Sequence, residues 1–334
     1  MAASSRPSRP KQQRLNPAGS GKAGSSKPGN GKTGRGKPGT APRAAAGDWI
    51  SGARLRTLPL AIAPVALGTG AAVVANGNGH WEPVLAVLCL VVALCLQIGV
   101  NYANDYSDGI RGTDDHRIGP ARLTGSGAAQ AKQVLAVSLA FFGLAALAGL
   151  AVVIVTQQWW LLAVGAAAIA AAWFYTGGKH PYGYYGLGEV FVFVFFGLVA
   201  TCGTTWVQAG TINTESWLSG VGIGLIACAV LMVNNLRDVE PDTAAGKRTL
   251  AVLVGKTAGR VLFCVFLLVP FLIAGFFALF YPLAPLTFFV LLLALPAALI
   301  TLTAKTAKEL ILALKLTSFV ALGYGLALGA AFAF

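Results

Sequence analysis

Long apolar runs dominate this chain of 334 residues. Several of them reach about 20 residues, the length that a helix needs to cross the hydrocarbon core of a bilayer. Only 11% of the residues are charged, against roughly 25% in an average soluble domain. We therefore expect an all-α, polytopic membrane protein.

The apolar runs and their flanks predict nine transmembrane helices. The expected spans lie near residues 57–77, 84–103, 130–155, 159–175, 188–209, 217–235, 259–280, 285–304 and 311–333. All 15 Lys and Arg residues beyond position 47 fall before the first span or in and around the even-numbered loops. The positive-inside rule then predicts a cytoplasmic N-terminus and, after an odd number of crossings, a C-terminus outside.

Residues 1–47 differ from the rest of the chain. They carry ten Lys and Arg residues and no acid, in a setting rich in Gly, Ser and Pro. Such a composition cannot bury enough apolar surface to offset its ordering entropy, so we expect a disordered basic tail. Anionic lipid head groups are its expected neighbours. No aromatic residues interleave its charges, so nothing favours nucleic acid as a partner. Residues 48–334 form the expected membrane domain.

Acidic residues are rare and concentrated. Of the 12 in the chain, seven lie in two short stretches, Asp105 to Asp115 and Asp238 to Asp242, each at the end of an apolar span. The charge pattern places both stretches on the cytoplasmic side, which indicates a shared cation.

The spacing within each stretch selects candidate metal ligands. If the helices continue, Asn104 and Asp108 lie at i and i+4 on one face, and Asp238 and Asp242 repeat that spacing. Asp105 turns away at i+1. Oxygen ligands without His or Cys favour Mg²⁺, which binds one or two carboxylates together with substrate phosphates. Two facing clusters therefore predict two Mg²⁺ ions on a diphosphate.

Basic residues in the same layer are candidate diphosphate contacts. They are Arg56, Lys179, Arg237 and Lys247. Loop 175–189 is also unusual, because it holds several glycines and four tyrosines, including Tyr175 and Tyr182. Aromatic faces stabilise cations, and interfacial tyrosines are also common in membrane proteins generally. Glu189 begins an apolar span, and an intramembrane carboxylate is a functional candidate.

These motifs resemble those of the UbiA-type intramembrane aromatic prenyltransferases, a family of nine-helix bundles. The first motif begins at Asn104-Asp105 and runs through Asp108 to Asp114, and the second spans Asp238 to Asp242. Arg56-Thr57-Leu58-Pro59 and loop 175–189 are most similar to the enzymes of menaquinone synthesis that act on 1,4-dihydroxy-2-naphthoate. The resemblance covers about residues 48–334.

The resemblance implies a plasma-membrane enzyme with a cytoplasmic active site and a defined set of roles. Asn104, Asp108, Asp238 and Asp242 would hold Mg²⁺ against a polyprenyl diphosphate, with Asp105 and Asp114 ranked behind them. Asp108, Asp238 and Lys179 would be catalytic, while Arg56, Lys179, Arg237 and Lys247 would neutralise the diphosphate. Tyr175, Tyr182 and Glu189 would face the aromatic substrate or the allylic cation. Loss of diphosphate and CO₂ would then give demethylmenaquinone.

Three other functions compete with this interpretation. A related enzyme of the same fold would prenylate another aromatic acid, such as 4-hydroxybenzoate. A cation transporter would carry ionisable residues at mid-depth in the membrane, whereas the acids here gather at one edge. A CDP-alcohol phosphotransferase would need a single long run that begins with Asp-Gly and ends in two Asp residues on adjacent helical turns, and the chain contains no such run. Prenyl chain length and oligomeric state are not encoded in any motif that we identify.

Overall fold

The computed structural model describes residues 44–77, 79–113 and 122–334. Its helical segments are α1 (Ala46–Gly52), η1 (Leu55–Thr57), α2 (Pro59–Asn76), α3 (Pro83–Arg111), α4 (Ala131–Thr156), α5 (Leu161–Phe174), η2 (Tyr182–Tyr185), α6 (Gly188–Val192), η3 (Phe193–Val199), α7 (Ala200–Ala209), α8 (Thr214–Arg237), α9 (Val239–Ala244), α10 (Leu250–Leu268), α11 (Pro270–Phe277), η4 (Ala284–Val290), α12 (Leu291–Thr303) and α13 (Glu309–Ala333). The described residues form no strand, which confirms the all-α prediction.

Eight helical spans in the described residues are long and apolar enough to cross a membrane. Several consist of consecutive segments, such as Gly188–Ala209, which joins α6, η3 and α7. Helix α5 coincides with the predicted fourth span but has only 14 residues, so it rises about 21 Å. The chain is therefore a multi-pass membrane protein. The count of nine crossings stays a prediction.

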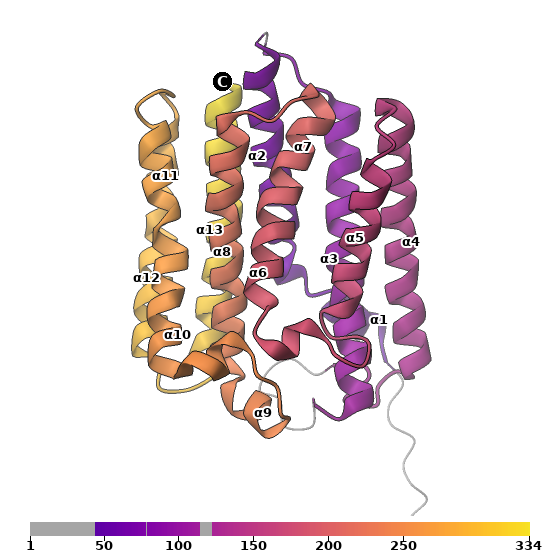
Figure 1. The fold of residues 1–334 in the computed structure, drawn as a ribbon. Helices are drawn as coiled ribbons and strands as arrows, with labels where there is room; N and C mark the ends of the chain where they lie inside the picture. The colour runs from indigo at the N-terminus through magenta and orange to yellow at the C-terminus, as the bar shows by residue number, and fades with distance from the viewer. Residues whose placement is uncertain (1–43, 78, 114–121) are drawn as a thin grey trace, which may run out of the picture. The chain divides into compact units, whose positions relative to one another are not determined.

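The long helices run side by side, and their loops gather at two ends (Figure 1). Helices α1 and α9 lie at the lower end in this view, and the C-terminus lies at the upper end. An odd number of crossings would place the first and last helices' outer termini, near α1 and the C-terminus, at opposite ends of the bundle in this way. Which end faces the cytoplasm stays a prediction. Of the predicted tail, residues 1–43 lie outside the described residues, and α1 begins at Ala46.

The most enclosed helices are α2 and α8. In their most apolar windows 67% and 72% of the residues are buried, compared with 22% in α4. Close helix contact needs small residues, because lipid tails are as apolar as the helix surfaces. Gly70 of α2 illustrates this, since an added Cβ would lie 2.2 Å from the carbonyl oxygen of Gly329 in α13.

One span contains a stretch of π-helix. Residues of η3 (Phe193–Val199) connect α6 to α7 with wider turns than an α-helix has, a feature that is frequent at functional sites. Gly197 lets this stretch approach α8, because a Cβ there would lie 2.6 Å from the Gly220 carbonyl oxygen. Phe195 and Phe196 line the cavity described below.

Candidate active site

The first acidic motif lies on the last turns of α3. Because α3 extends to Arg111, Asn104 and Asp108 share one helical face, as their spacing predicts. The second motif begins where α8 ends, with Asp238 as the capping residue. Asp242 lies on the short helix α9, and its backbone N–H donates to the Asp238 carbonyl oxygen at 2.8 Å.

Lys247 joins the two motifs. Its Nζ lies 3.2 Å from Asp108 Oδ1 and 3.8 Å from Asp242 Oδ1. All three side chains are largely buried. The two acidic stretches, far apart in sequence, therefore meet at the same end of the bundle.

Asp108 has two further partners. The Tyr184 hydroxyl donates to Asp108 Oδ1 at 2.6 Å, and Arg122 Nη1 lies 3.0 Å from Asp108 Oδ2. Arg122 also donates to the Asn104 carbonyl oxygen at 2.8 Å. The Asn104 side-chain oxygen in turn accepts a hydrogen bond from the Thr176 hydroxyl at 2.7 Å. These contacts fix both α3 candidate ligands.

Arg122 and Tyr184 were not singled out by the sequence. Arg122 belongs to no motif, and only the fold carries it back to Asp108. Tyr184 was one of four tyrosines in its loop, with nothing in the sequence to distinguish it. Arg54, which also lines the site, precedes the Arg56 motif and was missed for the same reason.

Asp105 has a different environment from Asp108. Its two carboxylate oxygens accept hydrogen bonds from the backbone N–H groups of Leu123 and Thr124, both at 2.9 Å. The side chain is buried and does not line the cavity. Asp105 thus holds the segment after the motif against α3. Asp114, the other lower-ranked candidate, lies outside the described residues.

The candidates around the second motif separate into two groups. Asp238 and Asp242 line the cavity, whereas Arg237 does not. Arg237 instead forms a buried ion pair with Asp238, in which Nε donates to Oδ1 at 2.8 Å. Burial raises the pKa of Asp242 to about 7, and the negative charges of Asp238 and Asp108 act in the same direction.

Of the other basic candidates, Lys247 alone lines the cavity. Arg56 is half-buried on η1, where burial and the nearby Arg237 lower its pKa. Lys179 is exposed in the loop after α5. The structure therefore brings Lys247 to the acids and leaves Lys179 away from the described cavity lining.

The aromatic candidates form part of the wall. Tyr175 and Tyr182 line the cavity, and Tyr182 stacks on Phe191 with ring centroids 3.9 Å apart. Glu189 is buried behind this wall. Its Oε1 accepts a hydrogen bond from Asn235 Nδ2 at 3.1 Å, and Asn235 lines the cavity in its place.

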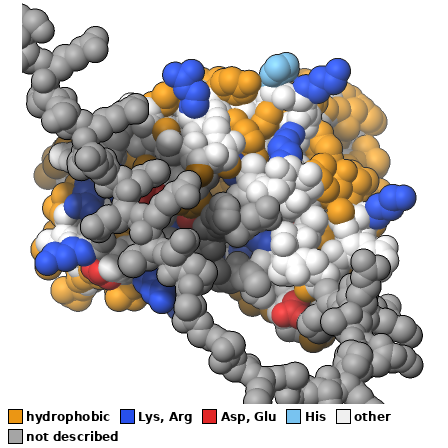
Figure 2. All heavy atoms as spheres, turned by 90° about the horizontal axis from the view of Figure 1, so that it is seen from below, with side chains coloured by type: hydrophobic (Ala, Val, Ile, Leu, Met, Phe, Trp, Pro, Cys, Tyr) orange, Lys and Arg blue, Asp and Glu red, His pale blue; other side chains and the backbone are white. Residues whose placement is uncertain are grey.

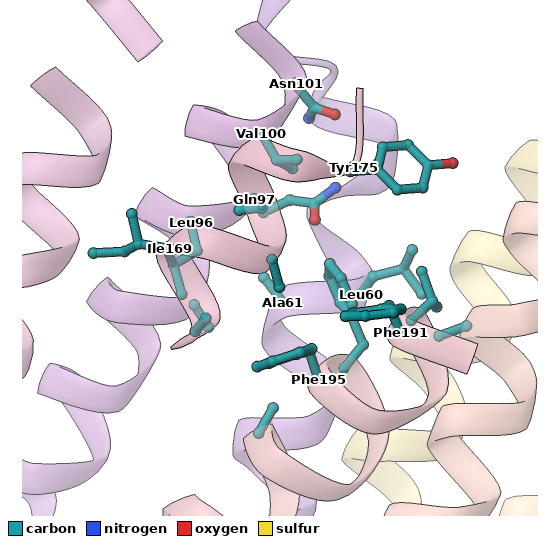
Figure 3. A pocket seen from close by; sticks show the side chains of 18 of the residues that line it. Leu60, Ala61, Leu96, Gln97, Val100, Asn101, Ile169, Tyr175, Phe191 and Phe195 are labelled. Carbon is teal, nitrogen blue, oxygen red and sulfur yellow. The ribbon is translucent and has the colours of Figure 1, made fainter. Parts of the chain in front are cut away.

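The cavity has a volume of about 590 Å³ and a polar and an apolar part (Figure 3). The acids, Lys247 and Arg122 lie at the polar end. Away from them the wall is formed by aliphatic and aromatic side chains from α2 to α8, including Leu60, Leu96 and Phe195. A lipid-like molecule with an anionic head group matches this division.

The donor atoms at the polar end fit Mg²⁺. Asn104, Asp108, Asp238 and Asp242 offer only oxygen, the ligand that Mg²⁺ prefers. The Lys247 ammonium already lies between carboxylates of both motifs, where a metal cation would be attracted. Within the described ranges, no three carboxylate, imidazole or thiolate side chains converge closely enough to hold a metal unaided. Substrate oxygens would complete the coordination.

Comparison with known proteins agrees with this arrangement. A family model described as the UbiA prenyltransferase family matches residues 61–319. A protein of Mycobacterium tuberculosis named 1,4-dihydroxy-2-naphthoate octaprenyltransferase is 46% identical over 291 residues, which cover 87% of this chain and 98% of the relative. A protein of the same name from Mycobacterium leprae is 48% identical over 220 residues, covering 66% and 74%.

A solved structure supports the fold. The UbiA homolog from Archaeoglobus fulgidus bound to DMAPP and Mg²⁺ matches with a TM-score of 0.59 at 14% identity, over 85% of this chain and 99% of that one. At this identity the likeness concerns the fold alone. The family model and the 46% identical relative each cover most of the membrane-spanning part, so this chain belongs to the UbiA prenyltransferase family.

Proposed function

We propose that this protein transfers a polyprenyl group from its diphosphate to 1,4-dihydroxy-2-naphthoate in menaquinone synthesis. The observation that carries the proposal is the convergence of two acidic motifs and Lys247 on the polar end of an apolar cavity. The names of the relatives from the two mycobacteria point to the same reaction and the same aromatic acid.

Asn104, Asp108, Asp238 and Asp242 would hold Mg²⁺, with two ions expected for two facing motifs. When bound, the metal neutralises negative charge on the diphosphate and makes it a better leaving group. The contacts of the Asp108 carboxylate support this role, because Arg122, Lys247 and the Tyr184 hydroxyl hold it in place.

Lys247 and Arg122 are the basic side chains best placed to contact the diphosphate, since both line the cavity. Arg54 lines it too. Arg56, Arg237 and Lys179 were expected to share this task. The buried pair with Asp238 supports a role for Arg237 in positioning that carboxylate. Lys179 would have to approach from the exposed loop after α5.

The reaction needs the C1–O bond of the donor to break and the electron-rich ring to attack C1. The bond to the ring carboxylate then breaks, and CO₂, diphosphate and demethylmenaquinol, the reduced form of demethylmenaquinone, are released. The aliphatic wall would exclude water from the developing allylic cation. Tyr175 and Tyr182 would present aromatic faces that stabilise it, and Glu189 would act through Asn235.

We further propose a plasma-membrane location with the acidic motifs facing the cytoplasm. Figure 2 views the end of the bundle where α1 and α9 lie, and Lys and Arg side chains stand at several places around its edge. The positive-inside rule assigns such an end to the cytoplasm. Deletion of residues 1–43, the part of the predicted basic tail that lies outside the described residues, should leave turnover by the purified enzyme unchanged.

Product analysis by mass spectrometry tests the function. The purified full chain is incubated with Mg²⁺, polyprenyl diphosphates of several lengths and one aromatic acid at a time. Decarboxylated, prenylated naphthoquinol from 1,4-dihydroxy-2-naphthoate is the expected product. Product from 4-hydroxybenzoate alone would replace the proposed acceptor with its nearest rival. Metal-ion flux into liposomes without any prenylated product would instead indicate a transporter.

A further inference from the structure

Gln97 of α3 has a hydrogen-bonding group that nothing in the described structure uses. The side chain is only 5% exposed and lines the cavity. Its Nε2 donates to the Thr57 hydroxyl at 3.0 Å, but its buried Oε1 has no hydrogen-bond partner. A buried acceptor without a partner is costly, and it calls for an explanation wherever it occurs.

The orientation of the Gln97 amide follows from its neighbours. The Thr57 hydroxyl has one hydrogen, which it donates to the Arg54 carbonyl oxygen at 2.9 Å. It can therefore only accept from Gln97 Nε2 and from Asn101 Nδ2, which lies 3.3 Å away. Turning the Gln97 amide over would place two acceptors against each other. Thr57 thus keeps the nitrogen of Gln97 on η1 and leaves the oxygen for another partner.

Gln97 also has a defined place relative to the metal ligands. The polar residues Gln97, Asn101, Asn104 and Asp108 are spaced by four, three and four positions, so they follow one face of α3. Gln97 is seven residues from Asn104, or about 10 Å along the helix axis. Figure 3 shows Gln97 and Asn101 among the cavity side chains, with the aromatic rings of Tyr175, Phe191 and Phe195 also on the wall.

We propose that Gln97 Oε1 accepts a hydrogen bond from a ring hydroxyl of the aromatic acceptor. A prenyl chain has no hydrogen-bond donor, so it cannot satisfy this oxygen. A hydroxylated ring can, and it must lie just beyond the diphosphate to reach C1 of the donor. Gln97 occupies this level of the cavity, with Thr57 and Asn101 holding its amide. The inference rests on the proposed function and adds to it a binding site for the acceptor.

The chain contains a matched control. Gln208 of α7 is also buried in an apolar helix, donates through Nε2 to a threonine hydroxyl (Thr69, 2.9 Å) and has a buried Oε1 without a partner. Unlike Gln97, Gln208 does not line the cavity. A general effect of removing a buried amide should therefore be equal in Gln97→Leu and Gln208→Leu, and an acceptor-binding effect should be confined to Gln97→Leu.

The test measures steady-state kinetics of both variants with 1,4-dihydroxy-2-naphthoate. We expect Gln97→Leu to raise KM for the acceptor about tenfold, with KM for the donor unchanged, and Gln208→Leu to leave both unchanged. Each of the analogues 1-hydroxy-2-naphthoate and 4-hydroxy-2-naphthoate lacks one of the two ring hydroxyls. Wild-type enzyme should have a higher KM for the analogue that lacks the hydroxyl bonded by Gln97. In Gln97→Leu this difference in KM between the two analogues should disappear.

A readout without turnover separates binding from folding. Gln97→Leu removes an unpaired acceptor, and the Thr57 hydroxyl that loses the Gln97 donor keeps Asn101 as a donor. The ligand-free variant should therefore unfold at no lower temperature than wild type, but stabilisation by added acceptor should decrease. An unchanged acceptor KM, or a change in donor KM instead, would overturn the inference. If wild type prenylates only 4-hydroxybenzoate, the proposed substrate is wrong, and the same comparison with that acid still decides the role of Gln97.

Discussion

Lys247 Nζ lies 3.2 Å from Asp108 Oδ1, across 139 positions of sequence. The contact joins the ends of two membrane helices, α3 and α8, through the segment that follows α9. Lys247 also lies 4.6 Å from the centroid of the Tyr184 ring, which adds a cation–π contact. One basic side chain therefore contacts both acidic motifs and the tyrosine-rich loop, and the site depends on all three.

Asp108→Asn should reduce turnover at least about a hundredfold, because it removes a charged ligand from the site that neutralises the leaving group. Volume and shape are kept, but the unfolding temperature should fall, because Arg122 and Lys247 lose the charge of their buried partner. The measurement is product formation over a range of Mg²⁺ concentrations, together with thermal unfolding. Glu240→Gln is the matched control, since Glu240 is an exposed acid of the second cluster that pairs with Lys256 at 2.7 Å and lies outside the cavity lining. Near-normal turnover by folded Asp108→Asn would contradict the metal site.

Asp105→Ala should affect stability rather than metal use. The substitution leaves the buried N–H of Leu123 and the part-buried N–H of Thr124 without their carboxylate acceptor. We expect a loss of about 2 kcal/mol or more in the free energy of unfolding. Asp105→Asn, which keeps one acceptor oxygen, should lie between alanine and wild type. Thermal unfolding measures the loss, and a shifted Mg²⁺ requirement in the folded fraction would show that Asp105 is a ligand after all.

Much of the fold follows from the sequence because the bilayer imposes one length and one polarity on every span. Each predicted span overlaps an observed apolar helix, and the i, i+4 spacing places Asn104 and Asp108 on one face. Contacts between distant segments could not be predicted. Arg122 and Tyr184 reach Asp108 only through the packing of loops against α3, and no local pattern encodes that packing.

Tyr184→Phe should weaken metal binding without abolishing it. The change removes the 2.6 Å hydrogen bond to Asp108 but leaves an aromatic face beneath Lys247. A hydrogen bond to a charged group is worth about 1.5–3 kcal/mol, so we expect roughly a tenfold loss in apparent Mg²⁺ affinity. Tyr184→Leu, which removes both contacts, should lose more. Binding of Mn²⁺ in the presence of a saturating, unreactive analogue of the diphosphate donor, followed by electron paramagnetic resonance, measures the affinity directly. Equal Mn²⁺ affinities of Tyr184→Phe, Tyr184→Leu and the wild-type enzyme would rule out this positioning role.

Gly203→Leu should shorten the longest prenyl donor that the enzyme uses well. Gly203 lines the cavity on α7, and an added Cβ would meet no atom within 4 Å. It lies 14 residues from Glu189 along the span Gly188–Ala209, a distance of roughly 20 Å along the helix axis. A leucine there would fill the apolar part of the cavity and leave the diphosphate site untouched. Gly143→Leu is the control, because Gly143 of α4 is equally unobstructed but exposed and outside the cavity lining. Relative kcat/KM across donors of increasing length is the measurement, and a uniform change at all lengths would contradict the prediction.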